Sequence, residues 1–206
     1  MPLPKNALPY EIFYRLGIHR ITWHRDAPVP EVAQWFDAGV LAGRTALEVG
    51  CGLASNALWL AKRGLRATAI DFSPRAVALA ARRAETLRVP LETRVVDVTV
   101  GEPSIGPFDV VVDCECLQDL ATPELRQAYA ASMRRWLAPG GALVIVTWLA
   151  RDEDEAKRFF PLSRLREQEL LGLFPGYRFE EQRIRRQRYV GVLGWHGVFR
   201  VRAPAD

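Results

Sequence analysis

Gly50 and Gly52 stand one residue apart after a short apolar segment that carries an acid, Glu48, near its end. A segment rich in Ala, Leu and Trp follows, so the pattern predicts a strand over 45–49, a tight turn and a helix over 54–63. A residue without Cβ allows a sharp turn at positive φ and leaves bare backbone for a ligand to lie against. The turn is therefore predicted to be a binding surface.

Three details around this turn indicate the kind of ligand. Ser55 occupies the position at which a dinucleotide-binding turn has its third glycine, so a pyrophosphate is not indicated. Glu48 would repel phosphates but can meet an ammonium group. Asp71 follows the next predicted strand, 66–70, and lies 21 residues after Gly50, where an acid can bind the two hydroxyls of a ribose. We therefore expect a cationic nucleoside without phosphates.

Four segments, in this order along the chain, carry a resemblance to a known family: 48–52, 71–74, 108–113 and 137–141. They resemble the motifs of class I S-adenosylmethionine (SAM) dependent methyltransferases. The resemblance implies an α/β fold, a Rossmann-like three-layer sandwich around a seven-stranded, mostly parallel sheet of order 3-2-1-4-5-7-6, with strand 7 antiparallel. It also implies SAM as the cofactor and S-adenosylhomocysteine (SAH) as its product.

The N-terminal part is similar to a narrower branch, the small-molecule methyltransferases that include the thiopurine and tellurite-resistance enzymes. This similarity rests on 22–23, Pro28, Pro30 and 43–44. The chain of 206 residues, 49% of them hydrophobic, suits one domain over 1–206. We expect an N-terminal helical arm or lid over 1–40 and a Rossmann-like core over 41–206.

Hydrophobic periodicity, prolines and glycines predict the remaining elements. The expected helices lie over 9–16, 30–38, 74–87, 122–137 and 163–174, and the expected strands over 91–96, 108–113, 142–148, 177–186 and 189–202. The first helix gathers apolar residues on one side: Leu8, Ile12, Phe13 and Leu16. The last two strands are close enough for a hairpin, which would supply the antiparallel edge of the sheet.

The resemblance assigns the cofactor to loops at the carboxyl ends of the strands. Asp97, followed by Val98, stands where the family places a carboxylate against the adenine amino group; the alternative is an acid that starts a turn in a solvated loop. Trp23 either presents its π face to the sulfonium or only anchors the N-terminal arm. The residues expected to bind SAM are Trp23, Glu48, Gly50, Cys51, Gly52, Asn56, Asp71, Phe72, Ser73, Asp97, Val98, Asp113, Cys114 and Glu115.

The methyl acceptor is expected beside 113–119, because ligands of open α/β sheets bind at the carboxyl edge. Cys116 is either a thiol near the acceptor or a small buried side chain, and Trp148 is either an aromatic wall or part of the core. Gln118 stands where the resembled branch often has a histidine, so the branch's substrate is not carried over to this chain. The residues expected to bind the acceptor are Tyr14, Cys116, Gln118 and Trp148.

Methyl transfer from a sulfonium is an in-line displacement from a donor that its own charge already activates. Positioning alone can therefore lower much of the barrier. Three residues are candidates for taking a proton from the acceptor: Glu115, His24 and His196. The alternative for Glu115 is a hydrogen bond to backbone or cofactor, and for each histidine a structural or solvated role.

Composition limits the other possibilities. The uncharged run 136–150 is too short to cross a bilayer, and the N-terminus does not read as a secretory signal, so we expect a soluble, cytoplasmic protein. Three cysteines do not make a disulfide framework. Cys114 and Cys116 form a C-x-C without a second pair or a nearby histidine, so no metal site is expected.

The formal net charge is +4, and the excess is concentrated in one predicted strand, at Arg183, Arg185, Arg186 and Arg188. Side chains that alternate along a strand can simply face water, so we expect a small-molecule acceptor and no nucleic-acid partner. We expect a monomer or a homodimer. Two rival classes are a nicotinamide-dependent oxidoreductase, which would need the third glycine, and a SAM-binding regulatory or assembly module without catalysis.

Overall fold

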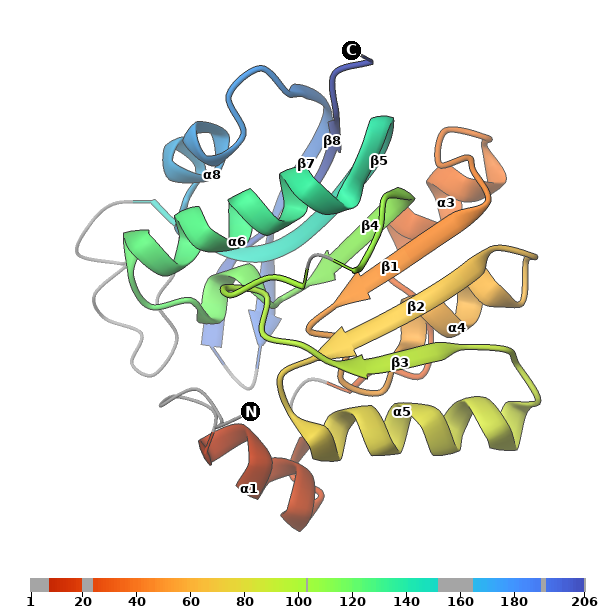
Figure 1. The fold of residues 1–206 in the computed structure, drawn as a ribbon. Helices are drawn as coiled ribbons and strands as arrows, with labels where there is room; N and C mark the ends of the chain where they lie inside the picture. Colours follow the sequence, from red (N-terminus) through yellow and green to blue (C-terminus); the bar gives the residue numbers. More distant parts are fainter. Residues whose placement is uncertain (1–7, 20–23, 103, 152–164, 190–191, 206) are drawn as a thin grey trace.

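The computed structural model describes residues 8–19, 24–102, 104–151, 165–189 and 192–205 (Figure 1). Trp23, which we expect to contact the cofactor, lies outside the described residues. The same is true of residues 152–157, most of a charged segment that follows the predicted strand 142–148. The strands are β1 (Thr45–Val49), β2 (Arg66–Asp71), β3 (Glu92–Val95), β4 (Phe108–Cys114), β5 (Leu137–Ala150), β6 (Leu165–Arg166), β7 (Arg178–Tyr189) and β8 (Val192–Arg202).

These strands form one sheet of order β3-β2-β1-β4-β5-β8-β7, with the short β6 beside β5. With β6 set aside, β7 and β8 are the sixth and seventh strands, and the order is the one expected from the resemblance. β8 is antiparallel to both of its neighbours, β5 and β7, whereas the pairs from β3 to β5 are parallel. The predicted fold class is therefore confirmed.

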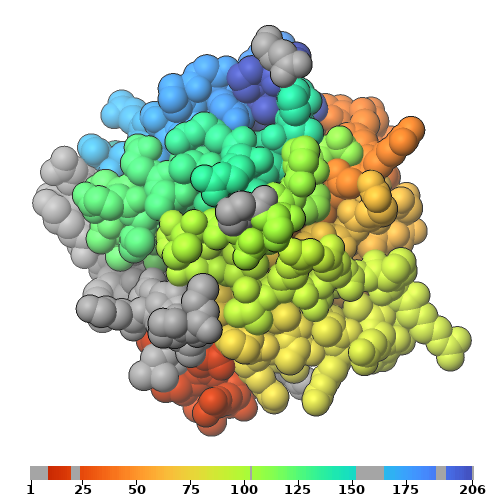
Figure 2. Space-filling view, in the orientation of Figure 1, coloured from red at the N-terminus to blue at the C-terminus, as the bar shows by residue number. Residues whose placement is uncertain are grey.

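Helices cover both faces of the sheet. They are α1 (Leu8–Leu16), α3 (Pro30–Asp37), α4 (Ser55–Ala61), α5 (Pro74–Leu87), α6 (Pro123–Trp136) and α8 (Glu167–Leu173), with a short 3-10 turn η1 (Leu117–Asp119). α6 and α8 pack on the face seen in front in Figure 1, and α6 (green) covers much of it in the space-filling view of Figure 2. α3, α4 and α5 share the core of the opposite face.

Both apolar layers follow from the sequence pattern. Val110, Val111 and Val112 of β4 are fully buried, as expected for a central parallel strand covered on two faces.

None of the described helices is both long and apolar enough to cross a membrane.

Two predicted elements differ from the structure. The helix expected over 163–174 begins only at Glu167, because Leu165 and Arg166 pair with Leu149 and Ala150 as the strand β6. β5 begins at Leu137 instead of residue 142: Leu137 pairs with Phe108, and the Pro-Gly-Gly segment forms a bulge before the ladder resumes.

Asp109 fastens the start of β4 to the start of β1. Its Oδ2 accepts hydrogen bonds from the backbone N–H groups of Arg44 (2.6 Å) and Thr45 (2.9 Å) and from the Thr45 hydroxyl (3.0 Å). Gly43 is needed here, since a Cβ at that residue would lie 2.2 Å from the Asp109 Cβ. This clamp sets the register in which β1 and β4 present their carboxyl ends.

Replacing Asp109 is expected to destabilise the fold. Burial acts to raise the pKa of Asp109, but the hydrogen bonds from Arg44 and Thr45 outweigh it and hold the pKa below its ordinary value. Its contribution is therefore present at neutral pH and lost as the pH falls through the lowered pKa. We expect Asp109→Ala to reduce the free energy of unfolding by about 1–3 kcal/mol at neutral pH, measured by urea denaturation.

Asp37→Ala is the matched control. Asp37 is mostly exposed, and its carboxylate lies 3.8 Å from the Arg63 guanidinium. Exposed pairs of this kind contribute at most about 1 kcal/mol, so this variant should stay close to the wild type. Equal losses in the two variants would contradict the clamp.

Candidate active site at the carboxyl edge of the sheet

The turn between β1 and α4 is built on two glycines in the left-handed conformation, Gly50 (φ 56°) and Gly52 (φ 52°). A Cβ on Gly50 would lie 2.6 Å from the Cys116 Cβ, and a Cβ on Gly52 would lie 3.1 Å from the hydroxyl oxygen of Tyr14. The bare backbone is thus approached from two sides, by the loop after β4 and by α1. Cys116 and Tyr14, both expected near the acceptor, are next to the glycine turn.

Glu48 holds the first turn of α4. Its Oε1 accepts a hydrogen bond from Asn56 Nδ2 and its Oε2 accepts one from the Ala57 N–H, both at 2.7 Å. Asn56 Oδ1 in turn accepts from the Val29 N–H at 2.8 Å. Glu48 is buried, which raises its pKa to about 7. The expected contact between Glu48 and an ammonium group would have to compete with these internal bonds.

Asp71 joins the ends of β1 and β2. Its Oδ2 accepts from the Gly52 N–H at 3.0 Å and its Oδ1 from the Ser73 N–H at 2.9 Å. Burial raises the pKa of this carboxyl to about 6, and the nearby Glu11 acts in the same direction. Asp71 therefore lies beside the glycine turn, as the sequence predicted, and supports that turn through the Gly52 N–H.

α1 packs against this edge through polar and aromatic side chains. Tyr10 hydrogen-bonds to the Asp119 carboxylate and lies edge-on to Phe72, with ring centroids 5.6 Å apart. The Glu11 carboxylate accepts a hydrogen bond from the Ser73 hydroxyl. Ser73 also caps α5 by accepting from the Ala76 N–H at 3.0 Å.

The prediction that the apolar side of α1 is its buried side is wrong in part. Ile12 is 43% exposed and Leu16 is 69% exposed, whereas Glu11 and Tyr14 are buried. Tyr10 and Glu11 were missed because hydrophobic periodicity assumes an apolar partner, and α1 packs on polar loops, among them the predicted segment 113–119. The signal that could have found them is the polar and aromatic spacing of 10, 11 and 14 on one side of a helix.

The other expected cofactor residues have mainly internal partners. Asp97 Oδ1 accepts from the Thr99 N–H (2.8 Å) and hydroxyl (2.6 Å), the pattern of an acid that starts a turn. Val98 is buried in the core beneath α6. Cys51 is buried, and its N–H donates to the Ile70 carbonyl at 2.9 Å. The contact of Asp97 with adenine stays a prediction.

Asp113 shapes the loop after β4. It is fully buried, and its oxygens accept from the N–H groups of Cys116 (2.8 Å) and Leu117 (3.1 Å). Burial raises its pKa to about 7. Gln118 Oε1 accepts from the Trp148 N–H at 2.8 Å and so ties η1 to β5. Asp113 and Gln118 therefore position the site in this structure.

Four side chains from distant parts of the chain meet beyond this loop: Arg25, Glu115, Trp148 and His196. Glu115 Oε1 lies 2.8 Å from the Arg25 guanidinium and 4.0 Å from His196 Nε2. The rings of His196 and Trp148 are 5.1 Å apart and nearly perpendicular. Glu115 has φ 69°, a strained conformation for a residue with a side chain. Burial raises the pKa of Glu115, and Arg25 opposes that shift.

His24 is placed differently. Its Nε2 lies 3.0 Å from the exposed Asp26 carboxylate, and its ring faces His19 with centroids 6.4 Å apart. Within the described residues, no bond joins His24 to Glu115 or His196. Cys114 is half-buried on β4, and burial raises the pKa of its thiol.

The acids at this edge repel one another. Burial raises the pKa of Asp119 to about 7, and Glu115, Asp113 and Asp71 add to that increase. Burial also raises the pKa of the Cys116 thiol, and the nearby carboxylates of Asp113, Asp119, Asp71 and Asp97 add to that increase. An edge that holds this many buried acids favours a positively charged ligand.

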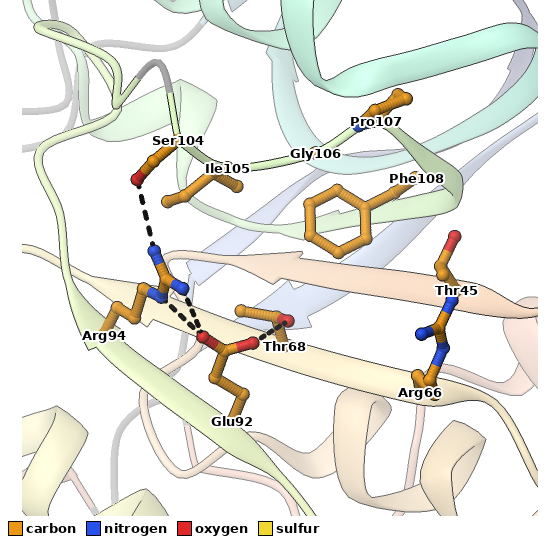
Figure 3. A pocket seen from close by; sticks show the side chains of 10 residues that line it. All are labelled: Thr45, Arg66, Thr68, Glu92, Arg94, Ser104, Ile105, Gly106, Pro107 and Phe108. Carbon is orange, nitrogen blue, oxygen red and sulfur yellow. Dashed lines mark hydrogen bonds and ion pairs between the residues drawn. The ribbon is translucent and has the colours of Figure 1, made fainter.

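A surface pocket of about 280 Å³ lies at the opposite end of the sheet (Figure 3). It is lined by residues at the amino ends of the strands, among them Thr45, Arg66, Glu92 and Phe108. The Arg94 guanidinium and the Glu92 carboxylate are paired inside it. Because ligands of open α/β sheets bind at the carboxyl edge, this pocket is not the candidate active site.

Comparisons with known proteins show which domain and which fold the chain resembles. Residues 46–141 match a family described as a methyltransferase domain. The 2-heptyl-1-hydroxyquinolin-4(1H)-one methyltransferase of Mycobacteroides abscessus is 31% identical over 130 residues, or 63% of this chain and 56% of that protein. The chain spans between 39% and 56% of the length of the first curated relatives that it matches.

Solved structures show the same fold. Magnesium protoporphyrin IX methyltransferase (ChlM) of Synechocystis PCC 6803 with bound SAM has a TM-score of 0.73 at 15% identity, over 98% of each chain. The [4+2]-cyclase SpnF has a TM-score of 0.77 at 16% identity, over 99% of each chain. At these identities the likeness concerns the fold alone, and SpnF is named for a different reaction.

Residues 46–141 therefore match a methyltransferase domain, and the described chain has the Rossmann-like three-layer fold of the solved structures named above.

The glycine turn yields a stability prediction. Gly50→Ala and Gly64→Ala both place a side chain at positive φ (56° and 94°), which costs about 1–2 kcal/mol. A Cβ at Gly64 has no atom within 4 Å, whereas a Cβ at Gly50 overlaps Cys116. Overpacking adds about 1–3 kcal/mol, so we expect Gly50→Ala to lower the free energy of unfolding more than Gly64→Ala in urea titrations. Equal losses would show that Cys116 does not press on the turn.

Proposed function

We propose that this protein transfers a methyl group from SAM to a small-molecule acceptor by in-line displacement. The observation that carries the proposal is the meeting of a bare glycine turn, the acid Asp71, which we expect to bind a ribose, and a cluster of buried acids at the carboxyl edge of the sheet. The relative from Mycobacteroides abscessus is named for a hydroxylated heteroaromatic compound, which supports a small aromatic acceptor here.

The residues present fit SAM. Gly50 and Gly52 leave backbone that a Cβ would cover, Asp71 lies beside them, and the surrounding acids suit a cation. When bound, SAM supplies a methyl group on a positively charged sulfur. The chain binds its nucleoside, holds the acceptor in line and excludes water through α1 and the segment around Arg25. Oriented in this way, the reacting groups need little further chemical assistance.

The charges of β7 bear on the class of acceptor. The arginines of β7 that suggested a basic surface are partly paired: Arg183 with Glu181 at 2.6 Å and Arg185 with Glu31 at 2.7 Å. This supports a small-molecule acceptor over a nucleic acid. A single domain with an N-terminal arm over 1–40, a cytoplasmic location and a monomeric or homodimeric state stay predictions.

The rival function is a SAM-binding module without catalysis, and turnover separates the two. The protein should be incubated with radiolabelled SAM and a panel of thiols, phenols, heteroaromatic nitrogens and metalloid oxyanions. Transfer of label to one class of acceptor supports the enzyme. Tight SAM binding without transfer to any of them would favour the module.

The binding of SAM is expected to release protons from buried acids of the protein. At about pH 6.5, Asp71 (pKa about 6) and Asp119 (pKa about 7) are partly protonated. A nearby positive charge lowers the pKa of an acid, and a lower pKa at constant pH means fewer bound protons. Calorimetry in buffers of different ionisation enthalpy should therefore show more protons released with SAM than with SAH. Equal release would place the sulfonium away from these acids.

Asp71→Asn is expected to weaken the binding of both SAM and SAH, because both contain the ribose. A lost hydrogen bond to a charged group costs about 1–3 kcal/mol, or about 5- to 150-fold in Kd by calorimetry. Asp37→Asn is the control on the surface and should leave both affinities unchanged. Thermal unfolding of the variant checks the Gly52 and Ser73 bonds that Asp71 also makes. Unchanged affinity in a folded Asp71→Asn variant would contradict the site.

A further inference from the structure

His196, on β8, is a buried polar side chain beside the candidate acceptor site. It is 2% exposed, and neither ring nitrogen has a hydrogen-bond partner within the described part of the chain. A buried polar group without a partner costs about 1–3 kcal/mol. Such a group is retained at a functional site when its partner arrives with a ligand.

Side chains from several elements of the structure surround His196. Trp148 of β5 lies edge-on at 5.1 Å, and Glu115 Oε1, from the loop after β4, lies 4.0 Å from Nε2. Arg25 and Arg185 are the nearby positive charges, and each is paired with a carboxylate: Arg25 with Glu115 at 2.8 Å and Arg185 with Glu31 at 2.7 Å. An imidazole, an indole ring and a carboxylate thus converge at the edge where the methyl acceptor is proposed to bind.

We propose that His196 removes the proton from an acidic ring hydroxyl, such as that of a phenol, on a planar acceptor held against Trp148, and that Glu115 stabilises the imidazolium. This inference rests on the proposed function and names its acceptor class. It also gives Arg25, which the sequence pattern did not single out, a positioning role: its guanidinium holds the Glu115 carboxylate beside the imidazole.

The proton and electron balance is simple. The hydroxyl proton moves to an imidazole nitrogen while an oxygen lone pair forms the new O–CH3 bond. The S–CH3 bond breaks, and its electron pair stays on sulfur, which becomes the neutral thioether of SAH. The imidazolium, paired with Glu115, returns its proton to water after the product leaves.

The pKa of His196 supports the choice of an acidic hydroxyl, which the planar ring of Trp148 beside the imidazole also favours. Burial, with Arg25 and Arg185, lowers the pKa of His196 to about 4. The imidazole is therefore neutral at physiological pH and ready to accept a proton, but it is too weak a base for an aliphatic alcohol. A weak base assists only a hydroxyl that is already acidic, which agrees with a ring hydroxyl on a planar acceptor beside the Trp148 ring.

The test uses one probe, 4-nitrophenol, below and above its own ionisation pH, with wild type and His196→Gln. Below that pH the probe is neutral and needs a base, so we expect the variant to lose about 10²-fold or more in kcat/KM. Above it the probe is already a phenolate, and the variant should stay within about tenfold of the wild type. A merely structural role would lower both values equally and would overturn the proposal.

A second readout does not depend on turnover. In the SAH complex, the absorbance of bound 4-nitrophenol reports its ionised fraction, which should be higher in the wild type than in His196→Gln at the same pH. SAH affinity by calorimetry should be equal in the two proteins and shows that the variant is folded.

Different results would contradict the proposed acceptor class and the proposed function. Wild type that methylates thiophenol but not 4-nitrophenol would overturn the acceptor class and leave the methyltransferase activity in place. Failure to bind SAM or SAH would overturn the proposed function itself. Equal ionised fractions in the absorbance experiment would remove His196 as the proton acceptor.

Discussion

Three strands of the sheet end in or near a buried acid whose two oxygens hold the loop that follows. Glu48 on β1 binds the first turn of α4, Asp71 on β2 binds the glycine turn and the start of α5, and Asp113 on β4 binds the loop that carries Glu115. A buried carboxylate without such donors would cost several kcal/mol. The shapes of these loops and the positions of the acids are therefore determined together.

The same arrangement gives the edge its chemical character. Acids taken out of water and placed close together resist ionisation, and the pKa values of Asp71, Asp113 and Asp119 are raised to between about 6 and about 7. A positively charged ligand offsets both the free-energy cost of ionising a buried acid and the repulsion between neighbouring acids. An edge of this kind is stable enough to fold on internal hydrogen bonds and still favours a sulfonium over a neutral nucleoside.

The acceptor side is organised differently, by groups that are far apart in sequence. Glu115 is held in a strained left-handed conformation and meets Arg25 from the N-terminal segment and His196 from the last strand. α1 adds a cover whose inner face is polar, because it packs on loops instead of on the sheet. Strain, burial and an unpartnered imidazole all occur at one place, which is typical of a site that becomes complete only with its ligand.

The sequence by itself determined most of the strands, the glycine turn and the position of Asp71, because strand periodicity, positive-φ glycines and fixed spacing are local properties. The order of the strands in the sheet came from the resemblance of four motifs to a known family. It also named Glu115, His196 and Trp148 as candidates, but as separate residues. The tertiary structure decided that these three lie together and that His24 does not join them. It also showed that Arg25, Glu11 and Tyr10 belong to the edge and that Glu48 is engaged by α4. Contacts such as that between Arg25 and Glu115, which are 90 residues apart, depend on how distant segments pack, and no local pattern records them.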